Sequence, residues 1–202
     1  MCAILAPALA PVLIVALLAA PPARAASEPR PPARGSAREA EPLDLLARFE
    51  RPLARHGDWV RLPDGCSAWR PSAAGESWRP YLSGAWTWTD EGWFWVSEEP
   101  WAWATYHYGW WRHDGRLGWI WIPGVEWAPA WVVWRHGGGA VGWAPRSDDG
   151  AVLAAHWTFV ATGSLAGARL PAAALHAARL PALLASSRPV EEPPVSARRE
   201  AR

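Results

Sequence analysis

Lysine is absent from this chain: all 20 cationic residues are arginines, set against 19 acidic residues and a formal net charge of +1. The central part, residues 57–145, holds six arginines and nine acidic residues, a balance of minus three. A protein that binds nucleic acid needs a basic face to displace counterions from the phosphates. The charge pattern therefore argues against a nucleic-acid partner.

The sequence also lacks the short motifs that mark common catalytic and cofactor sites. It contains no G-x-S-x-G, H-E-x-x-H or C-x-x-C pattern and no glycine-rich phosphate loop. The triplet Gly137–Gly139 lies between β-favouring residues, which predicts a hairpin turn rather than a phosphate cradle. From motifs we therefore predict no catalytic residue, no metal site and no cofactor.

Cysteine is scarce, with two in 202 residues, and one of them lies in an apolar N-terminal segment. Residues 3–20 (AILAPALAPVLIVALLAA) precede PPARAAS, in which residues 23–25 (Ala-Arg-Ala) fit the small-x-small cleavage site of a secretory signal. We predict a signal peptide over residues 1–25, export to the periplasm or cell envelope, and no stable membrane span after cleavage. A retained membrane anchor is the alternative, but two prolines interrupt a run that is short for a span. Cleavage would leave Cys66 alone, so the mature fold is expected to be stabilised by packing without an internal disulfide.

Composition divides the rest of the chain into four segments. Residues 26–42 (ASEPRPPARGSAREAEP) have no apolar period, which predicts a disordered linker. A Trp-rich β-repeat domain is expected over residues 43–161, and it opens with one short helix because its first apolar residues recur every three or four positions. Residues 162–187 are expected to form short helical turns broken by prolines. Residues 188–202 are polar and are predicted to be a disordered tail.

Tryptophan is the residue in excess, and all 18 lie between Trp59 and Trp157. Gly-x-Trp recurs three times and Gly-Trp-x-Trp twice, at residues 57–59, 84–86, 109–111, 92–95 and 118–121. These recurrences define a repeat unit of about 26 residues. In each unit, Trp at two-residue spacing indicates one face of a strand, and signals such as Asp114-Gly115 indicate a turn. We predict a mainly β fold: an antiparallel meander of about four repeated Trp-rich hairpins, with a short N-terminal helix and short C-terminal helical turns.

Several Trp-containing strings form one long pattern: GDWV (57–60), WRPS (69–72), WRPY (78–81), GWFWVSEEPWAW (92–103), YHYGWW (106–111), GWIWIPGVEWAPAWVVWR (118–135) and GGGAVGWAP (137–145). Over about residues 43–160 this pattern resembles a family of bacterial Trp-rich exported proteins of unknown function. Some members of that family are associated with FecR-type domains, and this chain contains no FecR-like segment. The resemblance implies export and the repeat boundaries. It implies no activity, so no functional residue is assigned through it.

The tryptophans have two possible roles. Eighteen of them at about 200 Å² each would supply about 3,600 Å² of the roughly 10,000 Å² that a domain of this size buries, so all of them fit into a core. However, the strands GWFWV and GWIWI are apolar on both faces, which a single water-facing layer does not tolerate. Either the hairpins cover both faces, or one face is an aromatic platform for a ligand or partner. The candidate platform residues are Trp86, Trp88, Trp93, Trp95, Trp101, Trp103, Tyr106, Tyr108, Trp119 and Trp121.

Acidic and histidine side chains offer a second interpretation. Asp90 lies in a predicted turn, and Glu98 and Glu99 lie in a connector between units. Paired carboxylates beside a sugar cleft would be a glycosidase arrangement, although charged turns usually serve solubility. His107 and His113 are an even number of residues apart and would share one face of a strand, but a metal site needs a further ligand.

The leading functional hypothesis is an exported, non-enzymatic envelope protein that binds or scaffolds through its Trp-rich β-repeat. Its expected partner is an envelope protein or a glycan. The alternative is an envelope hydrolase that acts on a glycan with the acidic or histidine residues as its working groups. A purely structural module without a ligand is a third hypothesis.

Overall fold

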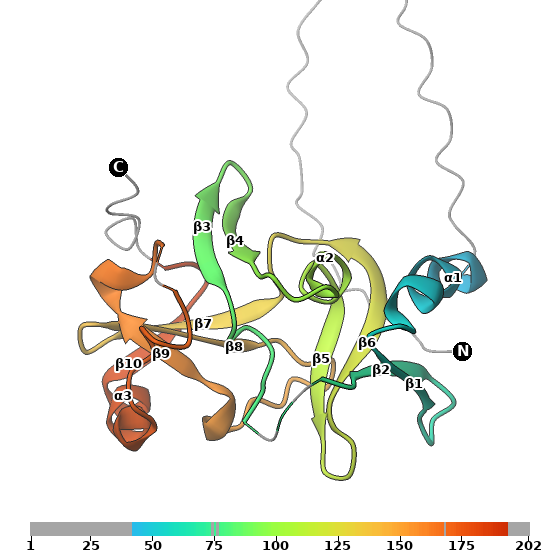
Figure 1. The fold of residues 1–202 in the computed structure, drawn as a ribbon. Helices are drawn as coiled ribbons and strands as arrows, with labels where there is room; N and C mark the ends of the chain where they lie inside the picture. Colours follow the sequence, from blue (N-terminus) through green and yellow to red (C-terminus); the bar gives the residue numbers. More distant parts are fainter. Residues whose placement is uncertain (1–41, 74, 76, 168, 194–202) are drawn as a thin grey trace, which may run out of the picture.

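The computed structural model describes residues 42–73, 75, 77–167 and 169–193 (Figure 1). The predicted signal peptide, the predicted linker up to residue 41, and residues 194–202 of the predicted tail lie outside the described residues. The elements, in chain order, are α1 (Pro42–Leu53), β1 (Gly57–Arg61), β2 (Ser67–Pro71), β3 (Ala85–Thr89), β4 (Gly92–Val96), α2 (Ala102–Thr105), β5 (Tyr108–Asp114), β6 (Gly118–Trp127), β7 (Val132–Gly137), β8 (Ala140–Pro145), β9 (Thr158–Ala161), α3 (Leu180–Ser186) and β10 (Ser187–Val190). Short 3-10 turns occur at Ala154–His156, Thr162–Ser164 and Ala177–Arg179.

The mainly β prediction is confirmed, and residues 57–145 fold as four antiparallel hairpins, β1–β2, β3–β4, β5–β6 and β7–β8. The predicted turn at Asp114 is formed by its own side chain, whose Oδ1 accepts hydrogen bonds from Arg116 N (2.8 Å) and Leu117 N (2.9 Å). Aspartate favours such turns because its short carboxylate reaches the backbone two residues on. The hairpins therefore follow from local sequence signals.

Close backbone approach explains why the repeat begins with Gly-x-Trp. A Cβ on Gly57 would lie 2.1 Å from Arg70 O and 2.6 Å from Cε2 of Trp69 on the opposite strand. A Cβ on Gly84 would lie 2.3 Å from Val96 O and 2.7 Å from Cζ2 of Trp95. In these two units, only glycine allows the indole of the exit strand to cross over the start of the entry strand.

The hairpins divide among three sheets instead of continuing as one meander. The strand orders are β1-β2-β6-β5, β10-β7-β8-β9 and the separate pair β3-β4. In the first sheet, the pairing of Trp69 in β2 with Trp121 in β6 joins the β1–β2 hairpin to the β5–β6 hairpin. The β3–β4 hairpin is fastened to the chain after β6, because Trp95 N donates to Pro129 O (3.1 Å). Packing hairpins against one another covers both apolar faces of the strands, as the pattern requires.

The core between the sheets is largely aromatic. Its largest fully buried side chains include Trp69, Trp86, Trp95, Trp111, Trp121, Trp143, Tyr81 and Tyr106. Tyr81 joins several of these segments: its hydroxyl donates to Tyr106 O (3.0 Å) and accepts from Trp131 N (3.0 Å). In addition, Nε1 of Trp143 donates to Tyr81 O (3.0 Å). These hydrogen bonds fix Tyr81 and Trp143 in the core, whereas the buried Nε1 atoms of Trp86, Trp95 and Trp111 have no hydrogen-bond partner among the described residues, so these rings are held by packing.

The C-terminal part completes the sheet that the β7–β8 hairpin begins. Strand β9 pairs with β8, and short helical turns are found in residues 162–187 as expected. Residues 187–190, however, form the edge strand β10, which overlaps the segment predicted to be a disordered tail. The physical reason is long-range: the Arg135 guanidinium donates to Leu184 O (3.0 Å) and to Ser187, which holds this segment beside β7.

None of the helices in the described residues is long and apolar enough to cross a membrane. Cys66 packs against a small cluster that contains Leu62 and Ile120.

Candidate ligand-binding surface

The structure divides the ten predicted platform residues into a core set and a surface set. Six of them are at most 5% exposed: Trp86, Trp93, Trp95, Trp101, Tyr106 and Trp121. Their rings pack on other aromatic rings and offer no open face to a ligand, so they stabilise the fold. The four others reach the surface, with Trp88 36% and Trp103 43% exposed and Tyr108 and Trp119 half-buried.

The four surface residues do not form a single row. Trp88 lies near the tip of the β3–β4 hairpin, packed edge-on against Trp93 (centroids 5.4 Å apart). Trp119 lies near the β5–β6 turn, where its ring centroid is 4.6 Å from that of His156. Trp103 and Tyr108 are neighbours because both pack on the buried ring of Phe49, at 5.9 and 5.5 Å.

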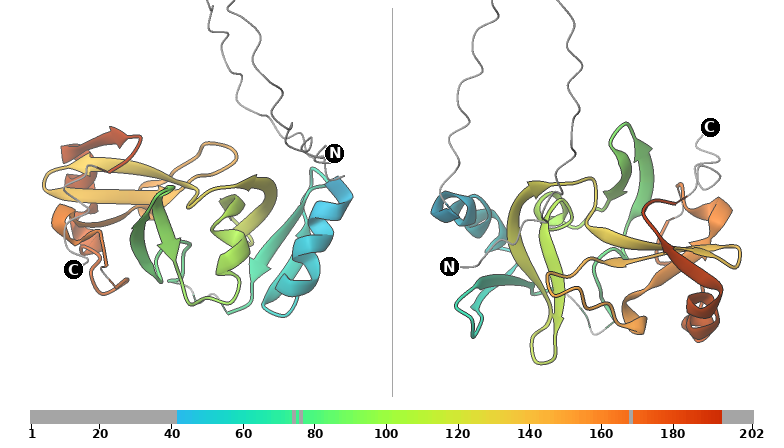
Figure 2. Two further views of the ribbon diagram at one scale, coloured as in Figure 1. Left: turned by 90° about the horizontal axis from the view of Figure 1, so that it is seen from above. Right: turned by 180° about the vertical axis from the view of Figure 1, so that it is seen from behind.

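Two further aromatic residues extend the Trp103–Tyr108 pair into a continuous surface. Trp127, 42% exposed, is the cross-strand partner of Tyr108 at the end of β6. The half-buried Phe94, on the outer side of β4, lies 6.4 Å from Trp127. We call Phe94, Trp103, Tyr108 and Trp127 the aromatic face. Figure 2 (left) shows α2 and β6 between the β3–β4 hairpin, which carries Phe94, and α1.

The aromatic face rests on a rigid base of stacked rings. His107 stacks on Phe94 (4.5 Å, 26° between ring planes) and on Trp127 (6.0 Å, 22°). The His107 Nδ1 is 3.2 Å from Ala128 O, which ties the ring to the chain after β6. Burial lowers the pKa of His107, despite the backbone contacts that oppose this shift, so the ring is neutral at pH 7. A neutral ring between two aromatic side chains keeps this part of the surface uncharged.

A cation borders the other end of the aromatic face. The Arg48 guanidinium lies 5.0 Å from the centroid of the Tyr108 ring, and its Nη2 donates to the Tyr108 hydroxyl (3.3 Å). Arg48 is itself exposed on α1. The surface therefore combines flat apolar rings with a hydrogen-bond donor at its border, the combination that anchors polar ring-shaped ligands and protein partners.

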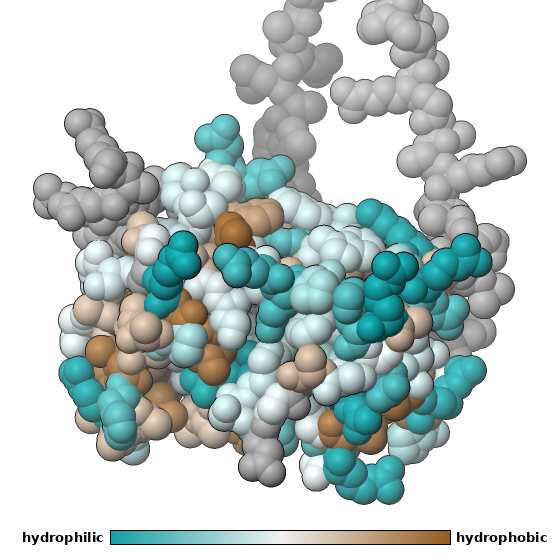
Figure 3. Space-filling view, in the orientation of Figure 1, coloured by the Kyte–Doolittle hydropathy of each residue, from teal (hydrophilic) through white to brown (hydrophobic). Residues whose placement is uncertain are grey.

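The wider surface around these rings is mixed. Val96 and Val125 are each 46% exposed and lie two residues from Phe94 and Trp127 on the same strands. In Figure 3 the strongly hydrophobic areas of the face that is drawn are small and separated by hydrophilic residues.

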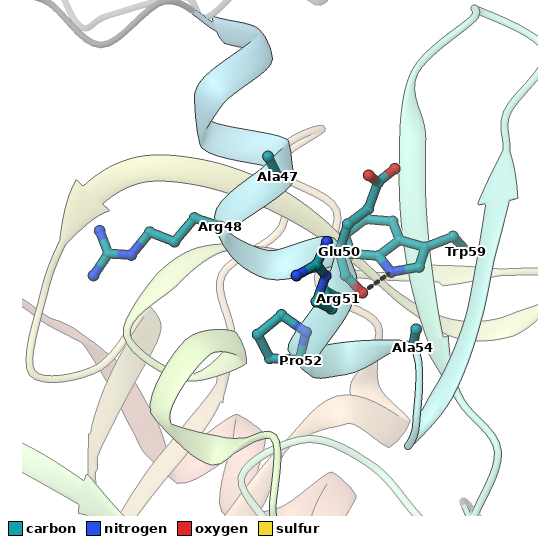
Figure 4. Close-up of a pocket in the computed structure, with 7 residues that line it drawn as sticks. All are labelled: Ala47, Arg48, Glu50, Arg51, Pro52, Ala54 and Trp59. Atoms are coloured by element: carbon teal, nitrogen blue, oxygen red, sulfur yellow. Dashed lines mark hydrogen bonds between the residues drawn. The ribbon is translucent and has the colours of Figure 1, made fainter.

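A shallow groove lies on the opposite side of α1, between this helix and β1. Figure 4 shows Trp59 beside Glu50 and Arg51, with its Nε1 donating to Glu50 O (3.2 Å), and Arg48 extending from α1 on the side away from Trp59. The charged side chains here are exposed, and the indole is already engaged by the helix. This groove offers less aromatic surface than the aromatic face does.

The acidic residues of the hydrolase hypothesis are not gathered into one site. Asp90 lies in the turn at the tip of the β3–β4 hairpin, and Glu98 and Glu99 lie beyond its base. A five-residue strand separates these positions by about 17 Å. Glu99 is occupied by its own protein: Oε1 accepts from Trp78 Nε1 (2.6 Å), and Oε2 accepts from Ser97 Oγ (3.3 Å) and the Tyr106 hydroxyl.

The two histidines considered for a metal site lie at opposite ends of β5. His107 precedes the strand and His113 is near its end, about 20 Å away along an extended chain. Within the residues that the structure describes, no group of three or more His, Cys, Asp or Glu side chains could hold a metal ion. The histidines therefore act in aromatic stacks, with His113 next to Trp119 (5.2 Å).

The sequence analysis did not place Phe94 and Trp127 in the platform. Phe94 stands on the face of β4 opposite the tryptophans, and Trp127 follows Pro123 and Gly124, where the Trp-x-Trp spacing ends. A signal was present in the apolar residues on both faces of these strands. That signal indicates that some aromatic side chains reach the surface without indicating which.

Comparison with known proteins agrees with the expectation of a family of unknown function. Residues 50–149 match the model of a family described as a family of unknown function (DUF6600). This match covers the four Trp-rich hairpins and all four residues of the aromatic face, whereas Phe49, on which Trp103 and Tyr108 pack, lies just before it. No curated protein and no solved structure matches the chain.

Proposed function

We propose that this protein is an exported, non-enzymatic binding module of the cell envelope that holds a glycan on its aromatic face. The observation that supports this proposal most directly is the exposure of Trp103 and Trp127, 43% and 42%, on a base of packed aromatic rings. A large aromatic side chain normally gains free energy by burial, at about 25 cal/mol per Å² of apolar surface. Two half-exposed indoles on one surface are a reason to expect an occupant.

Ring geometry favours a sugar over a flexible apolar chain. A pyranose presents a flat face of C–H groups, which packs on an indole, and a rim of hydroxyls, which needs donors and acceptors. The aromatic face supplies the rings, and the Arg48 guanidinium lies at its border. The negative balance of residues 57–145 makes a strongly anionic polymer an unfavourable ligand.

Export is the second part of the proposal. It rests on the N-terminal apolar run and its small-residue cleavage site. Expression of the complete chain with a C-terminal tag, followed by fractionation and N-terminal sequencing, tests it. A mature protein in the envelope fraction that begins near residue 26 agrees with the proposal, whereas an uncleaved protein in the cytoplasm contradicts it.

Binding is best tested with uncharged oligosaccharides of β-1,4-linked N-acetylglucosamine. The readout is the ¹H–¹⁵N spectrum of the indole N–H groups, since each tryptophan gives one such signal. Saturable shifts of the Trp103 and Trp127 signals are expected, and Trp103→Ala or Trp127→Ala should weaken binding about tenfold or more.

Trp88→Ala is the matched control, because Trp88 is 36% exposed but lies on the hairpin tip outside the aromatic face. It should leave the affinity unchanged. If the glycan shifts no indole signal, or if all three variants bind equally well, the glycan proposal is refuted. A response of the same two signals to an envelope protein instead would assign the surface to a protein partner.

A further inference from the structure

A cavity of about 590 Å³ lies at the base of the β3–β4 hairpin, and none of its lining residues belongs to the aromatic face. Its wall is made by the start of β3, the end of β4 with the connector that follows, and the chain at residues 169–170. Its lining includes the charged side chains of Glu98 and Arg169 and the apolar side chains of Val96, Pro100 and Leu170. Its volume lies within the range of about 300–1,000 Å³ that small-molecule sites occupy.

Hydrogen bonds hold these segments together. Leu170 N donates to Gly84 O (3.0 Å), and Ser97 Oγ donates to Ser83 O (2.8 Å). Glu99 fixes the connector to the core through Trp78 and Tyr106. Burial, with the nearby Glu99 carboxylate, raises the pKa of the Tyr106 hydroxyl well above its usual range, so Tyr106 stays a neutral donor to that carboxylate. The cavity is therefore preformed, which lowers the entropic cost of binding.

Two side chains of opposite charge line this cavity without a partner. Neither the Glu98 carboxylate nor the Arg169 guanidinium makes a hydrogen bond or an ion pair with any residue that the structure describes. Glu99, by contrast, has donors from its own protein on both oxygens. The cavity thus presents a carboxylate that can bind a cation and a guanidinium that can bind an anion. Val96, Pro100 and Leu170 provide apolar surface in the same wall.

We infer that this cavity binds a small zwitterion: a free amino acid or the charged ends of a short peptide. An ammonium group would be held by Glu98, a carboxylate would be held by the Arg169 fork, and the aliphatic part would pack on the apolar wall. Each charge of the ligand adds one charge-assisted contact, so a ligand with only one of the two charges should bind more weakly. The site uses none of the residues of the aromatic face, so a test of this site can fail or succeed whatever the outcome of the glycan experiment.

The test uses the full-length protein and four compounds: L-alanine, the dipeptide L-Ala-L-Ala, its N-acetyl form and its C-terminal amide. Binding is measured by calorimetry at low ionic strength, since salt screens exposed charges. Each capped form should bind about tenfold more weakly than the free dipeptide, because one charge-assisted contact is lost. Comparison of alanine with the dipeptide distinguishes an amino acid from a peptide end as the source of the zwitterion, and saturable binding of either supports the assignment.

Variants assign each charge to its partner. Glu98→Gln should abolish the difference between the free and N-acetylated dipeptides, and Arg169→Gln should abolish the difference between the free and amidated dipeptides. Asp90→Asn and Arg188→Gln are matched controls, because they remove the same charges at exposed positions outside the cavity. Thermal melts of all four variants should resemble the wild type, since these side chains are on the surface. Absence of saturable binding, equal binding of free and capped forms, or equal effects of the control variants would overturn the proposal.

Discussion

Tyr81 provides the sharpest test of how the aromatic core is held together. Its side chain is completely buried, and its hydroxyl connects two backbone groups from separate hairpin connections, Tyr106 O and Trp131 N. The residue has a φ of +60°, a left-handed conformation that costs a non-glycine residue about 1–2 kcal/mol. Burial raises the pKa of the Tyr81 hydroxyl far above its usual range, so the group stays neutral. Tertiary contacts thus fix both its backbone and its ring.

Replacement of Tyr81 by phenylalanine isolates the hydroxyl. The ring and its stacking on Trp86 (6.2 Å, 3° between planes) are retained. One buried carbonyl and one backbone N–H lose their partner, and each costs about 1–3 kcal/mol when it is left unsatisfied. With partial relaxation, we expect the free energy of unfolding to fall by about 2–4 kcal/mol. For a chain of this size the melting temperature should fall by about 4–16 °C.

Equilibrium unfolding in urea, followed by tryptophan fluorescence, measures this change. The midpoint should fall while the slope with denaturant stays the same, because the same surface is exposed on unfolding. Tyr108→Phe is the control: the Tyr108 hydroxyl accepts one hydrogen bond from the exposed Arg48, so its loss should cost no more than about 1 kcal/mol. A Tyr81→Phe protein within about 0.5 kcal/mol of the wild type, or an equal loss in the control, would show that the hydroxyl does not connect the hairpins as argued.

Two further predictions concern chain boundaries and pH. A protein limited to residues 50–149 should not unfold cooperatively, because it lacks β9, β10 and the buried Phe49. Far-UV circular dichroism measured against urea concentration checks this. A transition as cooperative as that of the full-length protein would contradict the prediction. Burial lowers the pKa of His107 in the folded state, so the unfolded state binds a proton at this residue more readily. The contribution of neutral His107 to the free energy of unfolding should therefore be fully present above about pH 6.5 and should decrease as the pH falls toward the lowered folded-state pKa. His107→Phe should lose part of this slope between pH 7.5 and 5.5 in urea titrations, whereas an unchanged slope would assign it to other groups such as His156, whose pKa is also lowered.

Local sequence signals determined the hairpins of this protein. Trp at two-residue spacing places side chains on one side of a strand. An Asp or Gly at a turn makes the required backbone conformation accessible, as Asp114 does through its own carboxylate. Gly57 and Gly84 mark the points where an indole crosses the neighbouring strand. These are interactions between residues close in the chain, so the pattern and its repeat were sufficient to predict the mainly β fold.

Tertiary structure decided which aromatic residues are buried, which charged side chains lack a partner among the described residues, and how far β structure extends toward the C-terminus. The strands are apolar on both faces, so their period does not distinguish the inner face from the outer one. The pairing of Trp69 with Trp121 buries one set of indoles, whereas the docking of β4 beside the chain after β6 leaves Phe94 and Trp127 at the surface. The strand β10 depends on Arg135, 52 residues from Ser187. Contacts at such separations depend on how the hairpins pack, and no local pattern in the sequence encodes that packing.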